Sequence, residues 1–541
     1  MKLSRRRALQ AASGVLLMPM VSNRVHAQPD LPETFAHGVA SGDPDEHSLV
    51  IWTRVSGLSE AGTVAWEVAG DADFRTVLAA GRTRASPRRD FTVKVLVTGL
   101  EPGGRYYYRF QHGGDTSDTG LARTLPVGDV EAMTLAVVSC SNYPFGYFNA
   151  YEAIADDEAV DWVLHLGDYI YEYGTDGYGG ESGRLLGREH SPPHEITTLA
   201  DYRQRHAQYK ADPKSRRMHA AHPVLAVWDD HEVTNNPWVG GAENHQPDSE
   251  GSWAARRDAA LRAYFEWMPV RDPFPGQPPS AYWRHWRFGS LASLLSLETR
   301  HSARARQIDY APYRDELTDR DGAERFLREV VGARNRPMLA PGMETFLREG
   351  LFETVSAGRT WKLIANQVPM ARTANPGFRA AALGELRRIT RPESRRRLEE
   401  IVRAGELGLP LYLDPWDGYP VARQEFYSLC ASCGVRDLLV LTGDSHSFWS
   451  NALLDDGGVP MGVELGTTGI TSPGDFLEFG PRGAELFDEA LAATNPEVLW
   501  TDGRHNGYLR LSLDRSEARA EYVAVDQVAR PSYLLSTLRS V

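Results

Sequence analysis

Runs of hydrophobic residues divide the chain into two parts. In the first part, four β-rich runs alternate with turns rich in glycine, proline and aspartate: residues 48–55, 63–68, 91–97 and 105–110. Short alternating runs at this spacing are typical of a small antiparallel sandwich. The turn at residues 99–104 is of a kind that fibronectin-like modules use, a likeness that concerns fold alone. We therefore predict an all-β sandwich domain over residues 31–125.

From about residue 131 the apolar runs become continuous. Five of them end at polar residues: 134–138, 162–166, 224–228, 361–365 and 438–441. Strands that are apolar at nearly every position are buried on both faces, as in parallel sheets. Helix-like segments lie between them, for example 254–267 and 393–404. The pattern predicts an α/β domain over residues 131–541, with helices covering a central pair of sheets.

Length and charge narrow the possibilities. At 541 residues the chain is too long for a single core, so at least two domains are expected. Its net charge of -13 argues against a stable complex with nucleic acid. The body of the chain contains no run of 18 apolar residues, so no transmembrane span is expected there.

The first 27 residues have the features of an export signal. Residues 4–9, SRRRAL, resemble a twin-arginine motif, and a modest apolar stretch follows at residues 8–21. Val25-His26-Ala27 is similar to a signal-peptidase site, which would begin the mature chain near Gln28. We predict a removable signal peptide over residues 1–27, recognition by the twin-arginine export machinery, and a periplasmic or extracellular protein.

Three cysteines are too few for a disulfide scaffold. Cys430 and Cys433 form a single C-x-x-C, which is compatible either with a short local disulfide or with two free thiols. Cys140 stands apart from them, directly after the apolar run 134–138.

Side chains that can bind metals follow four of the apolar runs. They are Cys140, then Asp168 and Tyr171, then Asp230 and His231, and finally Asp444 and His446. In open α/β sheets ligands bind beyond the carboxyl ends of the strands, so these side chains are expected to converge. Each has an ordinary structural alternative: an aspartate can cap a helix, and a lone cysteine is often a small buried hydrophobe.

The ligand types favour a particular pair of metals. A thiolate and a phenolate on one ion indicate iron, while several carboxylates favour calcium or magnesium over zinc. A carboxylate can bridge two cations with its two oxygens, and Asp168 is placed to do so. Metal pairs of this kind hydrolyse phosphate esters.

The chain resembles the alkaline phosphatase D family of the metallophosphoesterase superfamily. Asp230 and Asp444 stand where most of the superfamily has asparagine and histidine, and Cys140 stands in place of an aspartate. The matching segments span nearly the whole mature chain: residues 35–44, 49–54, 139–141, 165–173, 228–236, 366–367 and 442–449. One departure is Glu298, where an aspartate is expected, which leaves the supporting role of this position open.

The resemblance implies a fold and a metal centre. The fold is a four-layer α/β metallophosphoesterase-like domain, with two packed sheets flanked by helices, behind the N-terminal β-sandwich. The resemblance implies Fe3+ and one or two Ca2+. Iron would be held by a first set of residues, Cys140, Asp168, Tyr171 and His446. Calcium would share Asp168 and be held by a second set, Asp230, Asp444 and, less specifically, Asn235, a residue type that is also routine in loops.

The expected activity is that of a secreted alkaline phosphatase or phosphodiesterase acting on small-molecule or lipid phosphate esters. Asp168 would be essential to catalysis, and His231 would donate a hydrogen bond or proton near the leaving group. Arg203, Arg205 or Lys210 would neutralise charge on that group. Two alternatives remain open: a phospholipase-D-like phosphodiesterase acting on lipid head groups, and a non-catalytic protein that binds a wall polymer or a partner.

Overall fold

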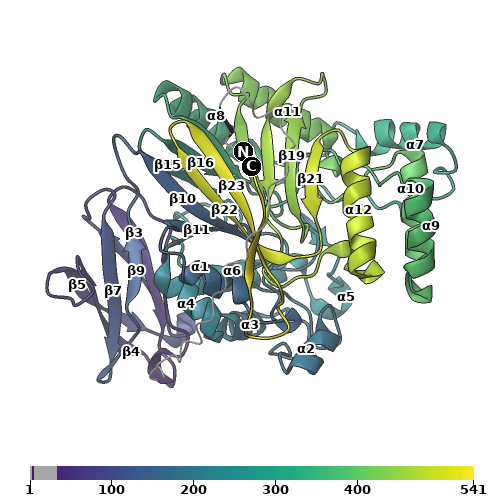
Figure 1. The fold of residues 1–541 in the computed structure, drawn as a ribbon. Helices are drawn as coiled ribbons and strands as arrows, with labels where there is room; N and C mark the ends of the chain where they lie inside the picture. The colour runs from purple at the N-terminus through teal and green to yellow at the C-terminus, as the bar shows by residue number, and fades with distance from the viewer. Residues whose placement is uncertain (1–2, 5–32) are drawn as a thin grey trace.

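The computed structural model describes residues 3, 4 and 33–541, in which two large sheets pack face to face between helices (Figure 1). The predicted signal peptide therefore lies almost entirely outside the described residues. The first sheet has ten strands, in the order β1 (Leu3–Ser4), β23 (Glu517–Val525), β22 (Asn506–Asp514), β10 (Ala132–Val138), β11 (Trp162–His165), β12 (Val224–Ala226), β2 (Val39–Gly42), β3 (Ser48–Arg54) and β6 (Thr92–Thr98), with β24 (Leu535–Ser540) beside β23.

The second sheet has seven strands. Their order is β15 (His285–Phe288), β16 (Ala292–Ser296), β17 (Trp361–Ala365), β18 (Leu438–Thr442), β20 (Pro460–Gly466), β19 (Phe448–Leu454) and β21 (Val498–Asp502). The central strands of both sheets are parallel: Leu135 pairs with Trp162 in the first, and Lys362 with Leu438 in the second. The continuous apolar runs in the sequence thus form buried parallel strands, as predicted.

Hydrophobic cores separate four layers. One core lies between the two sheets and includes Leu164 from β11 and Leu363 from β17. The first sheet is covered on its other face by helices that include α1 (Asn149–Ala155), α3 (Leu199–Ala211), α4 (Pro213–Ala221) and α6 (Trp253–Trp267). The second sheet is covered by α8 (Pro341–Ser356) and α11 (Pro420–Ser432). The predicted four-layer α/β architecture is confirmed.

The remaining helices lie outside these layers. They are α2 (Gly180–Leu186), α5 (Pro247–Glu250), α7 (Arg320–Phe326), α9 (Ala380–Ile389), α10 (Arg395–Leu407) and α12 (Gly480–Thr494). A short hairpin of β13 (Pro237–Trp238) and β14 (Gly241–Ala242) follows the β12 loop. None of the described helices combines the length and apolarity that a membrane crossing needs.

Local sequence explains where the helices over the first sheet begin. At α3, the Thr198 hydroxyl accepts from the Asp201 N–H while the Asp201 carboxylate accepts from the Thr198 N–H, which is a capping box. At α4, the Asp212 carboxylate caps the free N–H groups of the first turn, and Pro213 occupies the first helical position, where no N–H is needed.

The N-terminal β region forms the predicted sandwich, but one of its sheets is shared. Strands β5 (Val77–Ala85), β4 (Gly62–Ala69), β7 (Arg105–His112), β8 (Asp115–Thr116) and β9 (Gly120–Arg123) form a separate sheet. The opposing strands β2, β3 and β6 continue the ten-stranded sheet, because Gly42 of β2 pairs with Val224 of β12. A Cβ atom at Gly42 would lie 2.4 Å from the Val224 carbonyl oxygen, so this contact requires glycine.

Strand β5 was not among the predicted elements. Its sequence, VLAAGRTRA, is rich in alanine, glycine and arginine, which are poor strand formers, and it forms an exposed edge of its sheet. The division into domains at residues 31–125 and 131–541 stays a prediction, since the ladder of backbone hydrogen bonds crosses it between β2 and β12.

Candidate metal centre

The predicted ligands lie beyond the carboxyl ends of neighbouring strands. Cys140 follows β10, Asp168 follows β11, Asp230 follows β12, and Asp444 and His446 follow β18. The first three strands belong to the ten-stranded sheet and β18 to the seven-stranded sheet. The two sheets thus bring the four sequence segments together at one edge.

Two local features hold these strand ends close. Gly167 has a φ of +106°, and a Cβ atom there would lie 2.2 Å from the backbone nitrogen of Asp229, so the approach of the two loops depends on glycine. The buried Glu232 carboxylate accepts hydrogen bonds from the backbone N–H groups of Asp168 (3.1 Å), Tyr169 (2.6 Å) and Asp229 (2.8 Å). Glu232 thereby joins the loop after β11 to the loop after β12.

The first predicted ligand set is assembled around one point. The Cys140 thiol lies 3.4 Å from Asp168 Oδ2, and the Tyr171 hydroxyl donates to the same oxygen at 3.0 Å. The Tyr171 oxygen lies 3.4 Å from His446 Nε2. Such separations match neighbouring ligands around one ion with bonds of about 2.0–2.3 Å, as measured for zinc.

His446 is oriented by its other ring nitrogen. Nδ1 lies 3.1 Å from the Pro473 carbonyl oxygen, so it carries the proton and leaves Nε2 as a free electron-pair donor toward Tyr171. Ser472 Oγ donates to the Tyr171 hydroxyl oxygen at 2.8 Å. Residues 472 and 473 therefore position two of the predicted ligands, Tyr171 and His446.

Several of these residues have strained backbones. Cys140, Asp168, Asp444 and His446 all have positive φ values, between 50° and 63°. Non-glycine residues rarely adopt this conformation, and strain of this kind is concentrated at functional sites.

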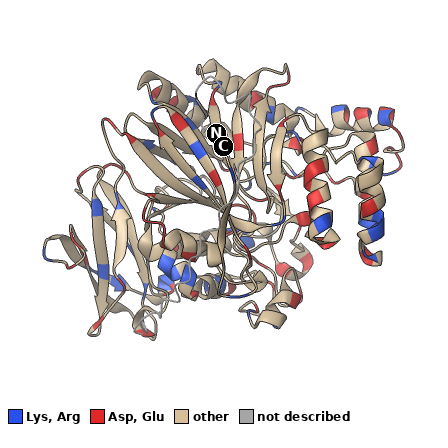
Figure 2. Cartoon of the chain, in the orientation of Figure 1, with Lys and Arg blue, Asp and Glu red and all other residues tan. Residues whose placement is uncertain are grey.

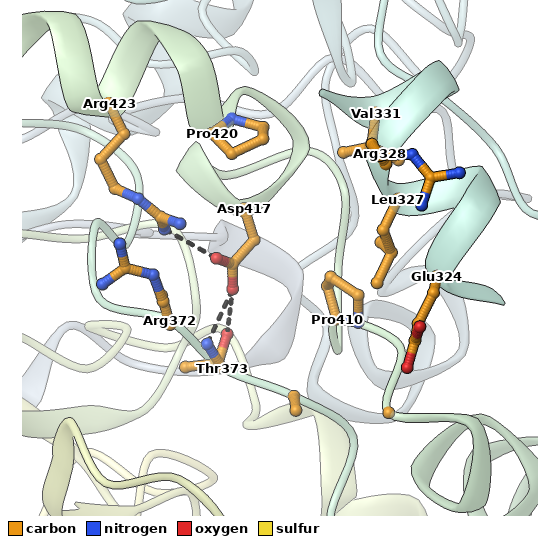
Figure 3. Close-up of a pocket in the computed structure, with 12 residues that line it drawn as sticks. Glu324, Leu327, Arg328, Val331, Arg372, Thr373, Pro410, Asp417, Pro420 and Arg423 are labelled. Carbon is orange, nitrogen blue, oxygen red and sulfur yellow. Dashed lines mark hydrogen bonds and ion pairs between the residues drawn. The ribbon is translucent and has the colours of Figure 1, made fainter. Parts of the chain in front are cut away.

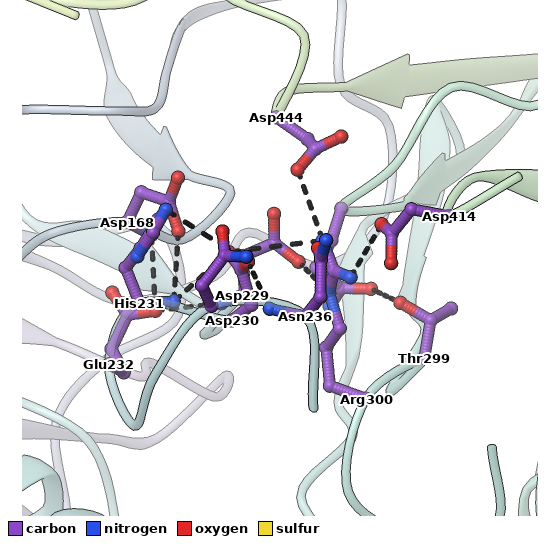
Figure 4. A network of polar contacts seen from close by, with 12 residues as sticks. Asp168, Asp229, Asp230, His231, Glu232, Asn236, Thr299, Arg300, Asp414 and Asp444 are labelled. Carbon is purple, nitrogen blue, oxygen red and sulfur yellow. Dashed lines mark hydrogen bonds and ion pairs between the residues drawn. The ribbon is translucent and has the colours of Figure 1, made fainter. Parts of the chain in front are cut away.

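Two further groups of carboxylates adjoin the first set (Figure 4). Asp168, Asp230 and His231 bring ligand atoms within 4.8 Å of one another, and so do Asp229, Asp230 and Asp444. Asp168 belongs both to the first set, with Cys140 and His446, and to the group with Asp230 and His231. A bridging carboxylate requires this arrangement. Asp229 is a member that we did not predict as a ligand.

Arg300 is a buried cation among these carboxylates (Figure 4). Its guanidinium donates to Asp229 at 2.5 Å, to Asp414 at 2.7 Å and to Asp444 at 3.0 Å. Glu298 accepts from the Trp228 indole and from the backbone N–H of Arg300, so it orients the loop that carries the guanidinium. Glu298 therefore has a supporting role although the resembled family has aspartate there.

His231 is held between a carboxylate and an aromatic ring. Its Nδ1 lies 2.6 Å from Glu172 Oε2, and its ring stacks on Tyr171 with centroids 4.2 Å apart. Nε2 lies 4.0 Å from Asp230 Oδ2. Burial lowers the pKa of His231, but Asp230, Glu172 and Asp168 raise it to well above its ordinary value.

The structure places Asn235 at the margin of the centre. Its backbone N–H donates to Glu172 at 2.8 Å, and its side-chain amide lies 3.5 Å from Glu243. The neighbouring Asn236 contacts the cluster through its backbone, which donates to Asp230 at 2.9 Å. The role of Asn235 as a calcium ligand stays a prediction.

Burial and mutual repulsion disfavour ionisation of several groups in the centre, whereas Asp230 is buried but its pKa is lowered by His231 and Arg300. Burial, together with the carboxylate of Asp230, raises the pKa of Asp168 well above its usual range. Burial and Asp168 have the same effect on the pKa values of Cys140 and Tyr171. A thiol, a phenol and a carboxyl group this close ionise together only if a strong positive charge lies among them.

The donor set fits two cations. Asp229 Oδ2 is buried and has no hydrogen-bond partner in the protein, although its other oxygen pairs with Arg300. A buried carboxylate oxygen without a partner is costly, and a bound ion would satisfy it. Cys140, Asp168, Tyr171 and His446 offer sulfur, oxygen and nitrogen to one ion, and the remaining carboxylates offer oxygen to another.

The three basic residues proposed to neutralise the leaving group have other partners. Arg203 forms an ion pair with Glu266 at 2.6 Å, and Arg205 donates to backbone carbonyls that include that of Ser191. Lys210 is buried against His219, with 2.7 Å between Nζ and Nε2. The guanidinium that does reach the carboxylates is that of Arg300.

An open hollow leads away from the centre. It has a volume of about 640 Å3 and is lined by residues that include Asn236, Trp238, Tyr412 and Asp414. A different hollow, shown in Figure 3, is lined by residues of α7 and α11 and by the Asp417–Arg423 ion pair of 2.7 Å. Neither hollow is lined by a predicted ligand, but the first is lined by Asn236 and Asp414, which contact Asp230 and Arg300, so it adjoins the carboxylates.

Comparisons with known proteins agree with this geometry. Residues 135–522 match the PhoD-like phosphatase family, and residues 21–126 match the N-terminal domain of PhoD-like phosphatases. The chain is 34% identical to alkaline phosphatase D of Bacillus subtilis (strain 168) over 533 residues, covering 95% of this chain and 82% of that protein. A solved structure of PhoD superimposes with a TM-score of 0.76 at 32% identity, covering 95% of this chain and 91% of that one. The chain belongs to the PhoD-like phosphatase family and is a phosphoric ester hydrolase.

Proposed function

We propose that this hydrolase is an exported phosphatase and phosphodiesterase that works at alkaline pH with an Fe3+–Ca2+ centre. The observation that carries the proposal is the shared position of Asp168. One of its oxygens faces Cys140 and Tyr171, and the other accepts from the backbone N–H of His231 at 3.3 Å, on the side of Asp230. A carboxylate placed in this way can join two ions.

Each ion has its own ligands in this proposal. Cys140, Asp168, Tyr171 and His446 would hold Fe3+, and Asp168, Asp230 and Asp444, with Asn235, would hold Ca2+. A further calcium ion is compatible with the orphaned oxygen of Asp229. When bound, the two cations supply Lewis acidity, which draws charge from a phosphoryl group and lowers the pKa of a neighbouring water.

The protein's own residues supply orientation and a proton. Glu172 fixes the His231 ring through Nδ1, which leaves Nε2 directed toward the carboxylates, where it would protonate the departing oxygen of the ester. Arg300 holds Asp229 and Asp444 at fixed positions and offsets part of their charge. Glu172, His231 and Arg300 are buried, and the lower local dielectric strengthens both effects.

We also propose that the chain is exported by the twin-arginine route to the periplasm or beyond. The support is the sequence of residues 4–9 and 25–27, which lie outside the described residues apart from residue 4. Substrates would be small-molecule or lipid phosphate esters, and the alternative of a phospholipase-D-like activity on lipid head groups concerns this same site. Family membership sets aside the non-catalytic alternative.

Two measurements test the proposal. Elemental analysis of protein purified after export should find iron together with calcium, and zinc or manganese alone would refute the assigned ligands. Rates on a soluble aryl phosphate, its diester and a choline phospholipid, measured side by side, separate the phosphatase from the lipid phosphodiesterase.

A further inference from the structure

A helical hairpin stands away from the two sheets. Helix α9, the turn at Pro392–Ser394 and helix α10 form it, at the right edge of Figure 1. Leu386 of α9 and Leu398 of α10 belong to the same small hydrophobic core as Phe487 of α12. One face of the hairpin is therefore anchored on the protein.

The other face is basic. Residues 379–407, which span the hairpin, contain eight arginines against five glutamates, within a chain whose net charge is -13. Figure 2 shows lysine and arginine positions along these helices, with acidic positions between them. The hairpin is thus a locally positive element of an acidic protein.

Half of these arginines are not neutralised. Arg387 pairs with Glu399 at 2.8 Å, and Arg397 pairs with Glu478 at 2.5 Å. Within residues 33–541, four other arginines of the hairpin are exposed and take part in no ion pair: Arg379, Arg388, Arg391 and Arg395. Three of these four lie at or beside the turn that joins the two helices.

The hairpin borders a hollow on the side of the metal centre. Arg396 and Arg403 line a hollow next to α10, together with Tyr310 and Tyr412. Tyr310 and Tyr412 also line the hollow that reaches Asn236 and Asp414 beside the carboxylates. The two hollows are therefore neighbours, and the second adjoins the carboxylates.

We propose that the α9–α10 hairpin is an electrostatic docking element for the surface of an anionic phospholipid bilayer. Docking there would bring these hollows, and the metal centre beside the second, near molecules at that surface. The inference goes beyond the proposed hydrolysis and does not depend on which metals are bound.

Charge and composition favour a bilayer over other anionic partners. Residues 379–403 contain no phenylalanine, tyrosine or tryptophan, so the hairpin offers no platform on which single-stranded nucleic acid could stack. A long polyanion would also run along the acidic remainder of the protein, whereas a bilayer can meet the hairpin alone. No large hydrophobic residue of the hairpin is exposed, so contact is with the head groups and not by insertion.

The length of the hairpin makes such contact feasible. Helix α10 has 13 residues and is about 20 Å long at a rise of about 1.5 Å per residue. The screening length at 0.1 M salt is about 10 Å. Helix α10 is thus about two screening lengths long, so charges at its two ends act nearly independently.

The test compares wild-type protein with the triple variant Arg388→Gln, Arg391→Gln and Arg395→Gln by vesicle co-sedimentation. Wild-type protein should bind vesicles of mixed phosphatidylglycerol and phosphatidylcholine at low salt, and should not bind phosphatidylcholine alone. Each basic residue near an anionic surface contributes about fivefold in affinity, so the triple variant should bind about a hundredfold more weakly. Both proteins carry the same N-terminal segment, so the difference between them reports the hairpin.

A second triple variant is the matched control. Arg82, Arg84 and Arg88 are exposed on the N-terminal sandwich and form no ion pair among the described residues, so their change to glutamine alters net charge equally. This control should bind vesicles as wild type does. Both triple variants should hydrolyse a soluble aryl phosphate at the wild-type rate, which reports intact folding separately from docking.

Three results would overturn the proposal. The first is equal binding of wild-type protein to neutral and anionic vesicles. The second is an equal loss of vesicle binding in the two triple variants. The third is a difference between the two triple variants in binding DNA, with no difference between them in binding vesicles. The last result would assign the hairpin to an anionic polymer instead.

Discussion

Arg300 Nη2 lies 3.0 Å from Asp444 Oδ1, and the same guanidinium also reaches a loop of the other sheet. Arg300 follows β16 and Asp444 follows β18, both of the seven-stranded sheet, while the Arg300 Nε reaches Asp229, which follows β12 of the ten-stranded sheet. One guanidinium therefore holds the two halves of the centre in register. Its pKa is raised well above the ordinary value, because the surrounding carboxylates outweigh the effect of burial.

Replacing Arg300 with methionine should disrupt the centre. The change leaves several buried carboxylates without their cation, and removing one partner of a buried ion pair typically costs about 3–5 kcal/mol. We expect a lower melting temperature and a loss of activity of about a hundredfold or more. Because added Ca2+ can replace part of the missing charge, it should restore part of the melting temperature.

The matched control is Arg482→Met on α12. This arginine is half-exposed and pairs with Glu485 at 2.6 Å, and exposed pairs contribute little to stability. Calorimetry that found equal losses in the two variants would show that Arg300 has no special place in the centre.

Asp168→Ala should remove both metals and abolish activity, because the two ligand groups share this carboxylate. Elemental analysis and a single-turnover assay on an aryl phosphate would measure the two effects. Asp45→Asn, at a partly exposed aspartate paired with Arg271, is a control that should keep both metals. Retention of one metal at wild-type content would mean that Asp168 binds only the other.

Cys140→Ser should lower iron content and leave calcium nearly unchanged. The thiol lies beside Asp168 Oδ2 of the first ligand set and accepts a hydrogen bond from Ser139 Oγ. If Fe3+ is bound as proposed, wild-type protein should show a visible charge-transfer band from Tyr171 or Cys140, and the variant should show a weaker or shifted one. Cys430→Ser, which alters a buried thiol in a different core, should leave the spectrum as it is.

Sequence patterns predicted those parts of the centre that follow directly from a buried strand. Cys140, Asp168 and Asp230 each come one to four residues after an apolar run, so their convergence follows from the topology of a parallel sheet. The strands that precede them, β10, β11 and β12, were predicted for the same reason, as were β17 and β18, whereas the edge strand β5 and the C-terminal strands β19 to β24 were not predicted.

The residues that orient the ligands could not be predicted in the same way. Glu172 and Glu232 are ordinary glutamates in the sequence, and their roles arise from contacts with segments about 60 residues away, such as the Glu232–Tyr169 and Glu172–His231 hydrogen bonds. Arg300 did have a local signal, because it follows the apolar strand β16. Its partners, however, depend on how the two sheets pack, which no local pattern encodes.

His231→Asn should slow hydrolysis in a way that depends on the leaving group. Esters of alkyl alcohols need a proton on the departing oxygen, whereas a nitrophenolate leaves readily without one. We expect a loss of about 10²–10⁴-fold in kcat on alkyl phosphates and a much smaller loss on nitrophenyl phosphate. Equal losses on both substrates, with metal content unchanged, would assign His231 a role in binding and not in proton transfer.

Glu464→Gln should make stability less dependent on pH. Glu464 on β20 is fully buried and accepts hydrogen bonds from the Met370 N–H (2.5 Å) and from the Asn451 amide (2.7 Å). Burial, the largest effect, raises the pKa of Glu464 from 4.5 to about 7. Between these two pH values the folded protein keeps a proton that the unfolded chain releases, so stability falls as pH rises through that window.

A shift of this size corresponds to about 3 kcal/mol. Glutamine carries no charge at any pH, and its amide can donate to Asn451 Oδ1, which is buried without a partner, once the Asn451 amide turns over. Melting temperatures of the variant and wild type should therefore coincide below the window, and the variant should be the more stable above it. Glu425→Gln, at an exposed position on α11, should shift neither curve. A constant difference between Glu464→Gln and wild type at all pH values would show that the folded protein holds Glu464 ionised, with its charge stabilised by the N–H groups around it.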